Sequence, residues 1–214
     1  MKIPRRQALT ILAATTAAAL ARPAGAAPPA DLLARVAKAR APVHTLQGPF
    51  TQTRTIGLLS TEVKSTGTLA LLRPDRLRWA LAAPDDVTFW VGPEGLAYRS
   101  AHGQGRVPAS NARVAASLQD LHALLGGDLS RLSERWTLTV LRDDASGAEI
   151  EAVRIDADAG SPAVARKMRF ALAPDLIRPT HALLVEGEHD RTSIDFGELS
   201  VNAPLDEATM RPPA

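Results

Sequence analysis

The chain contains no cysteine and few aromatic residues: its 214 residues include four Phe, three Trp and one Tyr. Without a thiol there is no disulfide, no cysteine nucleophile and no cysteine to carry a lipid anchor. A domain without disulfides must draw its stability from its hydrophobic core alone, and the chain is long enough to build one such core.

Recognisable catalytic and metal-binding motifs are also missing. The five histidines do not show metal-ligand spacing such as HExxH, and there is no Gly-x-Ser-x-Gly elbow or phosphate-binding loop. The acidic pairs Asp85-Asp86 and Asp143-Asp144 fall at expected turns, where Asp commonly caps backbone amides. The sequence therefore predicts a protein that is not an enzyme and that uses no cofactor or metal.

The first 26 residues have the pattern of an export signal. A basic start with Arg5 and Arg6 precedes the apolar stretch Ala8–Ala21, and small residues up to Ala26 form a cleavage site. The apolar stretch is too short to span a bilayer as a stable helix. The arginine pair resembles a twin-arginine export motif, while the general secretory route also remains open. We expect cleavage near Ala26 and a single domain over residues 27–214.

The basic character of the whole chain comes from this signal. Removing it takes away four of the 25 basic residues, which leaves 21 against 23 acidic ones and a net charge of −2. The remaining charges are dispersed along the sequence and do not form runs. This balance gives no indication of a nucleic-acid partner.

The order of expected elements is helix, six strands, helix, five strands. Asp31 begins a helix that Pro42 ends, and short strands separated by Gly and Pro-Asp turns follow from Val43 to Val107. A second amphipathic helix over Asn111–Leu125 precedes strands near 136–142, 148–157, 167–173, 181–188 and 192–199. Eleven antiparallel strands must coil into a barrel-like sheet, and the helices can bury their apolar stripes only on its concave face. The fold class is therefore α+β.

Apolar side chains supply the candidate interior. They either fill a core or line a cavity, and the pattern alone leaves both open. The strand candidates are Leu69, Leu71, Leu77, Trp79, Phe89, Val91, Met168, Phe170, Leu183, Val185, Ile194 and Phe196, and the second helix offers Leu118, Leu121 and Leu125.

Several motifs resemble those of LolA-type periplasmic lipoprotein carriers. They are Phe50-Thr51-Gln52, the segment Arg73-Pro74-Asp75-x-Leu77-Arg78-Trp79, Pro84-Asp85 and, near the end, Asn202–Leu205. The resemblance covers about residues 30–213. It implies an unclosed half-barrel of about 11 antiparallel strands with a helical lid over an apolar cavity.

The resemblance also implies a function. A protein of this family is a periplasmic chaperone that binds the acyl chains of lipoproteins and shuttles them from the inner to the outer membrane. Its partners are acylated lipoproteins, an inner-membrane release complex and an outer-membrane acceptor. We expect a monomer that needs no cofactor and binds no nucleic acid.

Two positions of the motif have specific implied roles. Arg73 is expected to switch the lid by donating hydrogen bonds to backbone carbonyls of the lid segment, residues 111–127. The alternative for Arg73 is a surface salt bridge to Asp75, which would contribute little. Arg76 and Arg78 should point outward, and Leu77 occupies a position tied to docking on the release complex.

Three other kinds of protein stay open. One is a lipid- or amphiphile-binding module or envelope-stress sensor of the same fold with different cargo. Another is an exported hydrolase or cofactor enzyme, which would need clustered polar residues at strand ends. The third is a structural envelope domain with a filled interior.

Overall fold

The computed structural model describes residues 29–57, 61–108, 120, 122–125, 129–155, 165–187 and 189–212. The expected export signal, Leu118 and Leu121 lie outside the described residues, as does most of the expected second helix. Among the described residues, no helix is long and apolar enough to cross a membrane.

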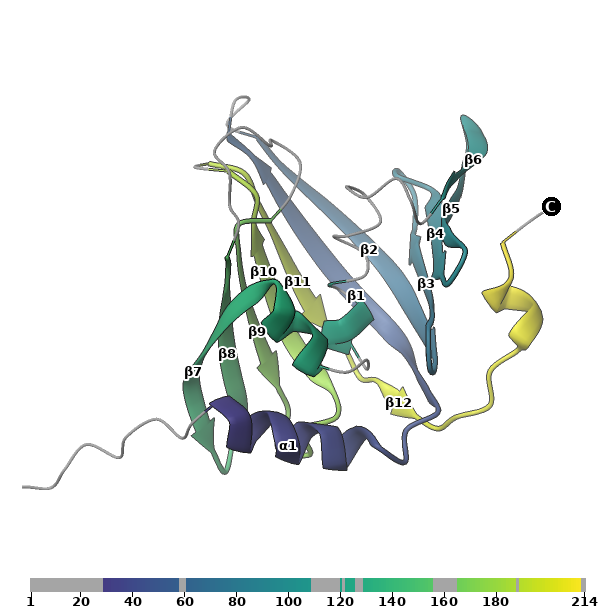
Figure 1. The fold of residues 1–214 in the computed structure, drawn as a ribbon. Helices are drawn as coiled ribbons and strands as arrows, with labels where there is room; N and C mark the ends of the chain where they lie inside the picture. The colour runs from purple at the N-terminus through teal and green to yellow at the C-terminus, as the bar shows by residue number, and fades with distance from the viewer. Residues whose placement is uncertain are drawn as a thin grey trace, which may run out of the picture.

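One antiparallel sheet dominates the molecule (Figure 1). Its order is β6-β5-β4-β3-β2-β1-β11-β10-β9-β8-β7, and β12 pairs with β1 beside this path. The strands are β1 (Thr45–Ile56), β2 (Thr61–Leu72), β3 (Arg76–Leu81), β4 (Val87–Gly92), β5 (Gly95–Ser100), β6 (Gly103–Pro108), β7 (Trp136–Asp144), β8 (Gly147–Arg154), β9 (Lys167–Leu172), β10 (Pro179–Val185), β11 (Arg191–Phe196) and β12 (Ser200–Val201). Because β6 and β7 lie at the two ends of the order and do not pair, the sheet is not closed.

The expected strand pattern is confirmed. Six strands, β1–β6, lie in the first group, and the five strands β7–β11 of the second group lie within a few residues of their predicted ranges. The two-residue β12 and the short 3-10 helices η2 (Leu129–Glu134) and η3 (Glu207–Met210) were not predicted. The fold class, a mostly antiparallel unclosed sheet with few helices, is confirmed as well.

Strand register divides the side chains of the sheet into two faces. Leu77 lies opposite Val91, and Trp79 lies opposite both Leu69 and Phe89, so the apolar residues of β2, β3 and β4 share one face. Since the side chains of a strand alternate, the residues between them point to the other face. The first set belongs to the core, so this is the inner face of the sheet.

The inward direction expected of Leu183 and Val185 is wrong. Leu183 pairs with Ser193 on one side and with Arg169 on the other, which places it on the outer face. Ala182 and Leu184 are the buried core residues of β10 instead. The run from Ala182 to Val185 is apolar at every position, so the sequence carries no alternation that could fix which residues face inward.

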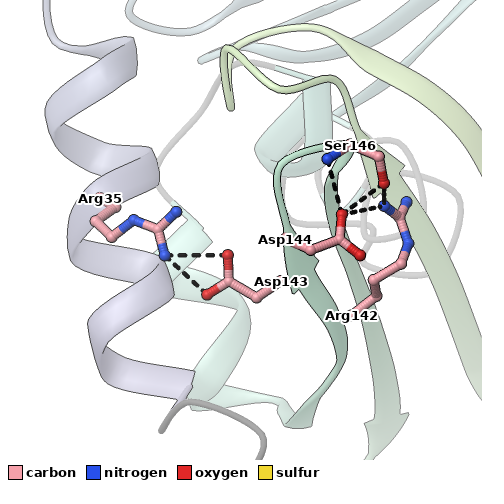
Figure 2. A network of polar contacts seen from close by, with 5 residues as sticks. All are labelled: Arg35, Arg142, Asp143, Asp144 and Ser146. Atoms are coloured by element: carbon pink, nitrogen blue, oxygen red, sulfur yellow. Dashed lines mark hydrogen bonds and ion pairs between the residues drawn. The ribbon is translucent and has the colours of Figure 1, made fainter. Parts of the chain in front are cut away.

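Helix α1 (Pro29–Arg40) confirms the first predicted helix and lies across one end of the sheet (Figure 1). Leu32 and Val36, one turn apart, are buried in the core. On its exposed side, Arg35 Nη1 donates to both carboxylate oxygens of Asp143 at the end of β7, at 3.0 and 2.8 Å (Figure 2). The helix is thereby attached to the edge strand on its polar side and to the core on its apolar side.

The next residue, Asp144, has the expected capping role at a turn. Its Oδ1 accepts a hydrogen bond from the backbone N–H of Ser146 at 2.8 Å and a second from the Ser146 hydroxyl (Figure 2). Arg142 contacts the same oxygen at 3.1 Å. Together these bonds shape the turn between β7 and β8.

Candidate functional site

The inner face of the sheet has two halves that differ in how fully they are covered. On β7–β9, Trp136, Ile150, Phe170 and Leu172 are at most 2% exposed, and both α1 and η2 pack on β7. On β4–β6, Val91 and Leu96 are buried, but Phe89 and Val107 are only half-buried and Tyr98 is 37% exposed. Register puts Tyr98 opposite Phe89 and thus on the same face.

An aromatic group lies between these halves. The rings of Phe50 and Trp79 stack with centroids 3.8 Å apart, and Phe196 meets Trp79 edge-on at 6.4 Å. Gly67 lies opposite Phe50, and a Cβ atom there would come within 2.4 Å of the Phe50 ring. Glycine at this position therefore makes room for the ring.

Most of the predicted inward residues are found in the interior. The buried ones are Leu69, Leu71, Leu77, Trp79, Val91, Leu125, Met168, Phe170 and Ile194, while Phe89 and Phe196 are half-buried and pack against them. Leu77, the position that the resemblance ties to docking, is buried, so its side chain is not accessible to a partner in this structure. Arg76 is exposed, and Arg78 pairs with Trp90 on the outer face, as expected for both arginines.

A hollow of about 720 Å³ lies mainly on the outer face of the sheet, although Phe50, Leu81 and Phe196 also border it. Most of its wall comes from outer-face residues: Thr51 pairs with Thr66, and both Thr68 and Thr88 pair with Ala80, so these side chains point away from the inner face. Among the described residues, no cluster of His, Cys, Asp or Glu could hold a metal ion.

Arg73 directs its side chain at the end of α1. Its Nη1 donates to the carbonyl oxygens of Arg40 and, at 3.4 Å, of Val43. Its backbone N–H also donates to His44 O at 2.9 Å. Within the described residues these carbonyls are its partners, and there is no Arg73–Asp75 ion pair. The expected bond from Arg73 to carbonyls of the lid segment is not found at the lid residues that the structure describes, 120 and 122–125.

Asn202 also binds the backbone of the residues that follow α1. Its side-chain nitrogen donates to Pro42 O at 2.9 Å, and its Oδ1 accepts from the backbone amides of His44 and Thr45. The residues that follow α1 therefore have their polar backbone groups satisfied by two side chains distant in sequence.

Arg40 is a buried arginine that the sequence analysis did not single out. It is 2% exposed, and its Nη2 donates to Leu124 O at 2.9 Å and to Ile177 O at 3.3 Å. Burial, followed by the positive charge of Arg73, lowers its pKa to about 10, so the group stays charged at neutral pH. The overlooked signal is its spacing: Arg40 continues the apolar stripe of Leu32 and Val36 at intervals of four residues.

Asp120 is the one buried carboxylate among the described residues. Arg135 donates a hydrogen bond to its Oδ1. Burial nevertheless dominates and raises the pKa of Asp120 above its ordinary value, although Arg135 acts in the opposite direction.

An unclosed antiparallel sheet with few helices is a fold that solved structures of other bacterial proteins share. The chain belongs to the LolA family: the family model described as outer membrane lipoprotein carrier protein LolA matches residues 41–211. No curated protein sequence matches the chain.

Solved structures share this fold at low sequence identity. MucB is 16% identical, with a TM-score of 0.53 over 89% of this chain and 64% of MucB. An uncharacterised conserved protein from Thermus thermophilus is 10% identical, with a TM-score of 0.53 over 86% of this chain and 93% of that one. A DUF1329-family protein from Desulfovibrio piger is 9% identical, with a TM-score of 0.50 over 85% of this chain and 95% of that one. At these identities the likeness concerns the fold alone.

Proposed function

We propose that this protein is a periplasmic carrier that binds the acyl chains of lipoproteins and moves them from the inner to the outer membrane. The observation that carries the proposal is the incompletely covered part of the inner face of β4–β6, where the half-buried Phe89 lies opposite Trp79 of the aromatic group and the exposed Tyr98 lies opposite Phe89. Partly exposed apolar surface of this kind marks a binding site. An acyl chain gains roughly 0.8 kcal/mol for each methylene that it buries, and needs no special polar partner.

The rest of the proposal follows the family. Residues 1–26 direct export and are cleaved near Ala26, and residues 27–214 work as one monomeric domain. An inner-membrane release complex supplies the lipoprotein, and an outer-membrane acceptor receives it. The carrier performs no chemical step, so it requires no cofactor, and it has no nucleic-acid partner.

The connection between the two edge strands supports a lid. The chain leaves edge strand β6 at Pro108 and returns to edge strand β7 at Trp136, so the intervening residues join the two margins of the open sheet. Within this connection, residues 122–125 are helical, and Leu124 and Leu125 are buried in the core. The proposed lid segment, residues 111–127, includes them.

Arg73 is the proposed switch of this lid. Its hydrogen bonds to the end of α1 stabilise the empty, closed form, and their loss on loading offsets part of the burial energy of the acyl chain. Cargo then binds firmly enough to be carried and weakly enough to be handed on.

The first test of function is binding of an acyl chain. Titration of the mature chain with a fluorescent acylated peptide should give saturable binding, while the unacylated peptide should not bind. Absence of binding by both peptides would overturn the proposal. Binding without transfer to acceptor vesicles would instead indicate a lipid-binding module of the same fold.

A matched pair of variants on β4 locates the binding face. Phe89→Ser should weaken binding of the acylated peptide by about tenfold, because it removes partly buried ring surface worth roughly 1.4 kcal/mol. Thr88→Ser, one residue earlier and on the outer face, is the control and should leave affinity unchanged. Equal affinities for the two variants would place the acyl chain elsewhere.

Arg73→Leu tests the switch. The variant should fold with near wild-type stability, because Arg73 is only partly buried, but it should release a bound acylated peptide to vesicles more slowly. Stopped-flow transfer measures the release rate, and circular dichroism confirms the fold. An unchanged rate would refute the role of Arg73.

A further inference from the structure

A second hollow, of about 390 Å³, lies at the β3–β6 end of the sheet. It is bordered by the turn between β4 and β5, by the last residues of edge strand β6 and by residues 210–212 of the C-terminal segment. In Figure 1 this yellow segment, which includes η3, lies beside the same end of the sheet. We call this hollow the Trp90 pocket, after the largest side chain on its border.

The Trp90 pocket opens mainly on the outer face of the sheet. Trp90 pairs with Ala97, and Ala97 pairs with Arg106, so these three border the pocket as one row of outer-face side chains. The neighbour of Trp90, Phe89, belongs to the inner face, and side chains alternate along a strand. Three inner-face residues also border the pocket: Val91, Leu96 and Val107.

Two glycines leave this part of the outer face unfilled. Gly92 pairs with Gly95, and Gly95 pairs with Pro108, in the row next to that of Trp90. A Cβ atom at Gly92 would meet no other atom within 4 Å, so there is open space where a side chain would normally lie. Gly95 has a φ of 122°, which residues with a side chain rarely adopt. The β4–β5 turn therefore accounts for the pocket.

The C-terminal segment supplies a further wall. Asp206 caps η3 by accepting a hydrogen bond from Ala208 N at 2.9 Å, and Thr209 O accepts one from Trp90 Nε1, also at 2.9 Å. Met210 is buried, although it does not belong to the main core, and η3 packs on β3. The segment is thus held against the sheet by both a polar and an apolar contact.

Positive charge surrounds the Trp90 pocket. Arg76 borders it from β3, Arg106 from β6 and Arg211 from the C-terminal segment, and Glu94 is the one acidic residue among the described residues of its border. Among the described residues, the exposed side chains of Arg76 and Arg211 make no ion pair or hydrogen bond. A guanidinium group matches the geometry of carboxylate and phosphate groups, so these two arginines are available to an anion.

We propose that the Trp90 pocket binds a small organic anion, in which a phosphate or carboxylate group contacts the arginines and an apolar body lies against Trp90 and Met210. A volume of about 390 Å³ is usual for a small-molecule site, and so is a wall of apolar surface with a few charged groups. The site is separate from the proposed acyl-binding face, because Trp90 and Phe89 lie on opposite faces of β4. The two proposals can therefore fail independently.

Phenyl phosphate is the first probe, because it joins a phosphate group to a single aromatic ring. Calorimetric titration of the mature chain should show saturable binding of phenyl phosphate, binding of inorganic phosphate that is about tenfold weaker, and no binding of phenol. Added salt should weaken the binding of both phosphates. Equal affinities for phenyl phosphate and inorganic phosphate, or no binding of either, would overturn the proposal.

Matched arginine variants locate the anion. Arg76→Gln and Arg211→Gln should each weaken the binding of phenyl phosphate by about fivefold, because each removes one guanidinium group from the border. Arg99→Gln is the control: Arg99 is an exposed arginine of the same outer face, contacts Gln104 at 3.4 Å and does not border the pocket. An equal loss of affinity in all three variants would indicate only the general charge of this face and would overturn the proposal.

Filling the pocket tests its apolar part. Gly92→Val places a side chain in the open space and, because Gly92 does not have a positive φ, should unfold at the temperature of wild type. It should bind phenyl phosphate about tenfold more weakly, and Gly92→Ala should show a smaller loss. Binding of the acylated peptide should be the same in wild type and both variants. Wild-type affinity of Gly92→Val for phenyl phosphate would overturn the proposal.

The indole N–H resonance of Trp90 reports on the pocket directly. Its absence from the spectrum of Trp90→Phe identifies it, and it should shift when phenyl phosphate is added, whereas the indole resonances of the buried Trp79 and Trp136 should not. A shift of Trp79 without a shift of Trp90 would place the probe on the inner face and overturn the proposal.

Phosphatidylglycerol vesicles distinguish the two sources of such an anion. Competition of the vesicles with phenyl phosphate would identify an exposed lipid headgroup as the ligand, and lack of competition would identify a free small molecule. Both results support the pocket and differ only in where its ligand comes from. Vesicle binding that Gly92→Val and Arg76→Gln leave unchanged, in a protein that does not bind phenyl phosphate, would overturn the proposal.

Discussion

The two halves of the inner face use apolar residues for different purposes. On β7–β9 most of the large inward side chains are buried, and α1 and η2 pack on β7, as in an ordinary core. On β4–β6, Phe89 and Tyr98 stay partly exposed in the same sheet and on the same face. One half therefore contributes a filled core, and the other is less completely covered, which is the basis of the proposed binding site.

The largest expected effect contrasts one phenylalanine from each half. Phe170→Ala should lower the free energy of unfolding by about 3–5 kcal/mol, because it empties a fully buried site. Phe89→Ala should cost less, roughly 2 kcal/mol, because part of its ring area stays exposed in the folded protein. Urea unfolding of both variants measures the difference, and similar losses of stability would erase the distinction between the halves.

A smaller effect concerns the buried carboxylate of Asp120, next to η2 and β7. Its pKa is raised in the folded protein, chiefly by burial, so the folded state prefers the protonated form. The contribution of Asp120 to stability should therefore increase as the pH falls from neutral toward the unfolded pKa near 3.9, and decrease as the pH rises again.

The effect is isolated by comparing the free energy of unfolding of wild type with that of Asp120→Asn at each pH. Carboxyl groups with a lowered pKa, such as Glu151, lose stability on acidification in both proteins, so their contribution cancels. Chemical unfolding at several pH values between about 4 and 7 provides it. Wild type should gain stability relative to the variant on acidification. A relative loss would mean that the ion pair with Arg135 outweighs burial.

The smallest expected change in stability concerns Glu151, on the outer face of β8 in the β7–β9 half of the sheet. Glu151 Oε2 contacts Lys167 Nζ at 2.7 Å and Arg169 Nη2 at 3.0 Å, and the hydrogen bond from Lys167, followed by that from Arg169, lowers its pKa. Glu151→Gln should cost under about 1 kcal/mol at neutral pH, because the pairs are solvent-accessible. The cost should shrink with added salt and disappear at acidic pH, where the carboxylate of wild type is protonated.

The strand pattern was predictable because turn residues punctuate it. Pro74-Asp75, Pro84-Asp85 and the glycines around Pro93 mark the ends of successive strands, whereas Gly67 lies within β2 and does not interrupt it. The faces of β2, β3 and β9 were equally legible, since apolar and polar residues alternate there. On β10 the alternation is absent, and the inward residues were assigned to the wrong parity.

The roles of Arg73 and Arg40, in contrast, could not be predicted from local sequence. The resemblance drew attention to Arg73, but its partners lie at the end of α1, a contact that depends on how a helix crosses the sheet. Arg40 looked like an ordinary basic residue in the last turn of a helix. Only the three-dimensional meeting of α1, residues 122–125 and the β9–β10 turn reveals that it is buried and shared.

An open sheet has two edge strands, and an edge strand can recruit a neighbouring molecule by strand addition. Strand β6 is only six residues long, contains two glycines and Arg106, and ends at Pro108, which has no amide proton to donate. Strand β7 is covered by α1 and η2 and interrupted by a bulge between Val140 and Arg142. These margins are thus poor templates for aggregation, so the sheet can remain open without assembling into fibrils.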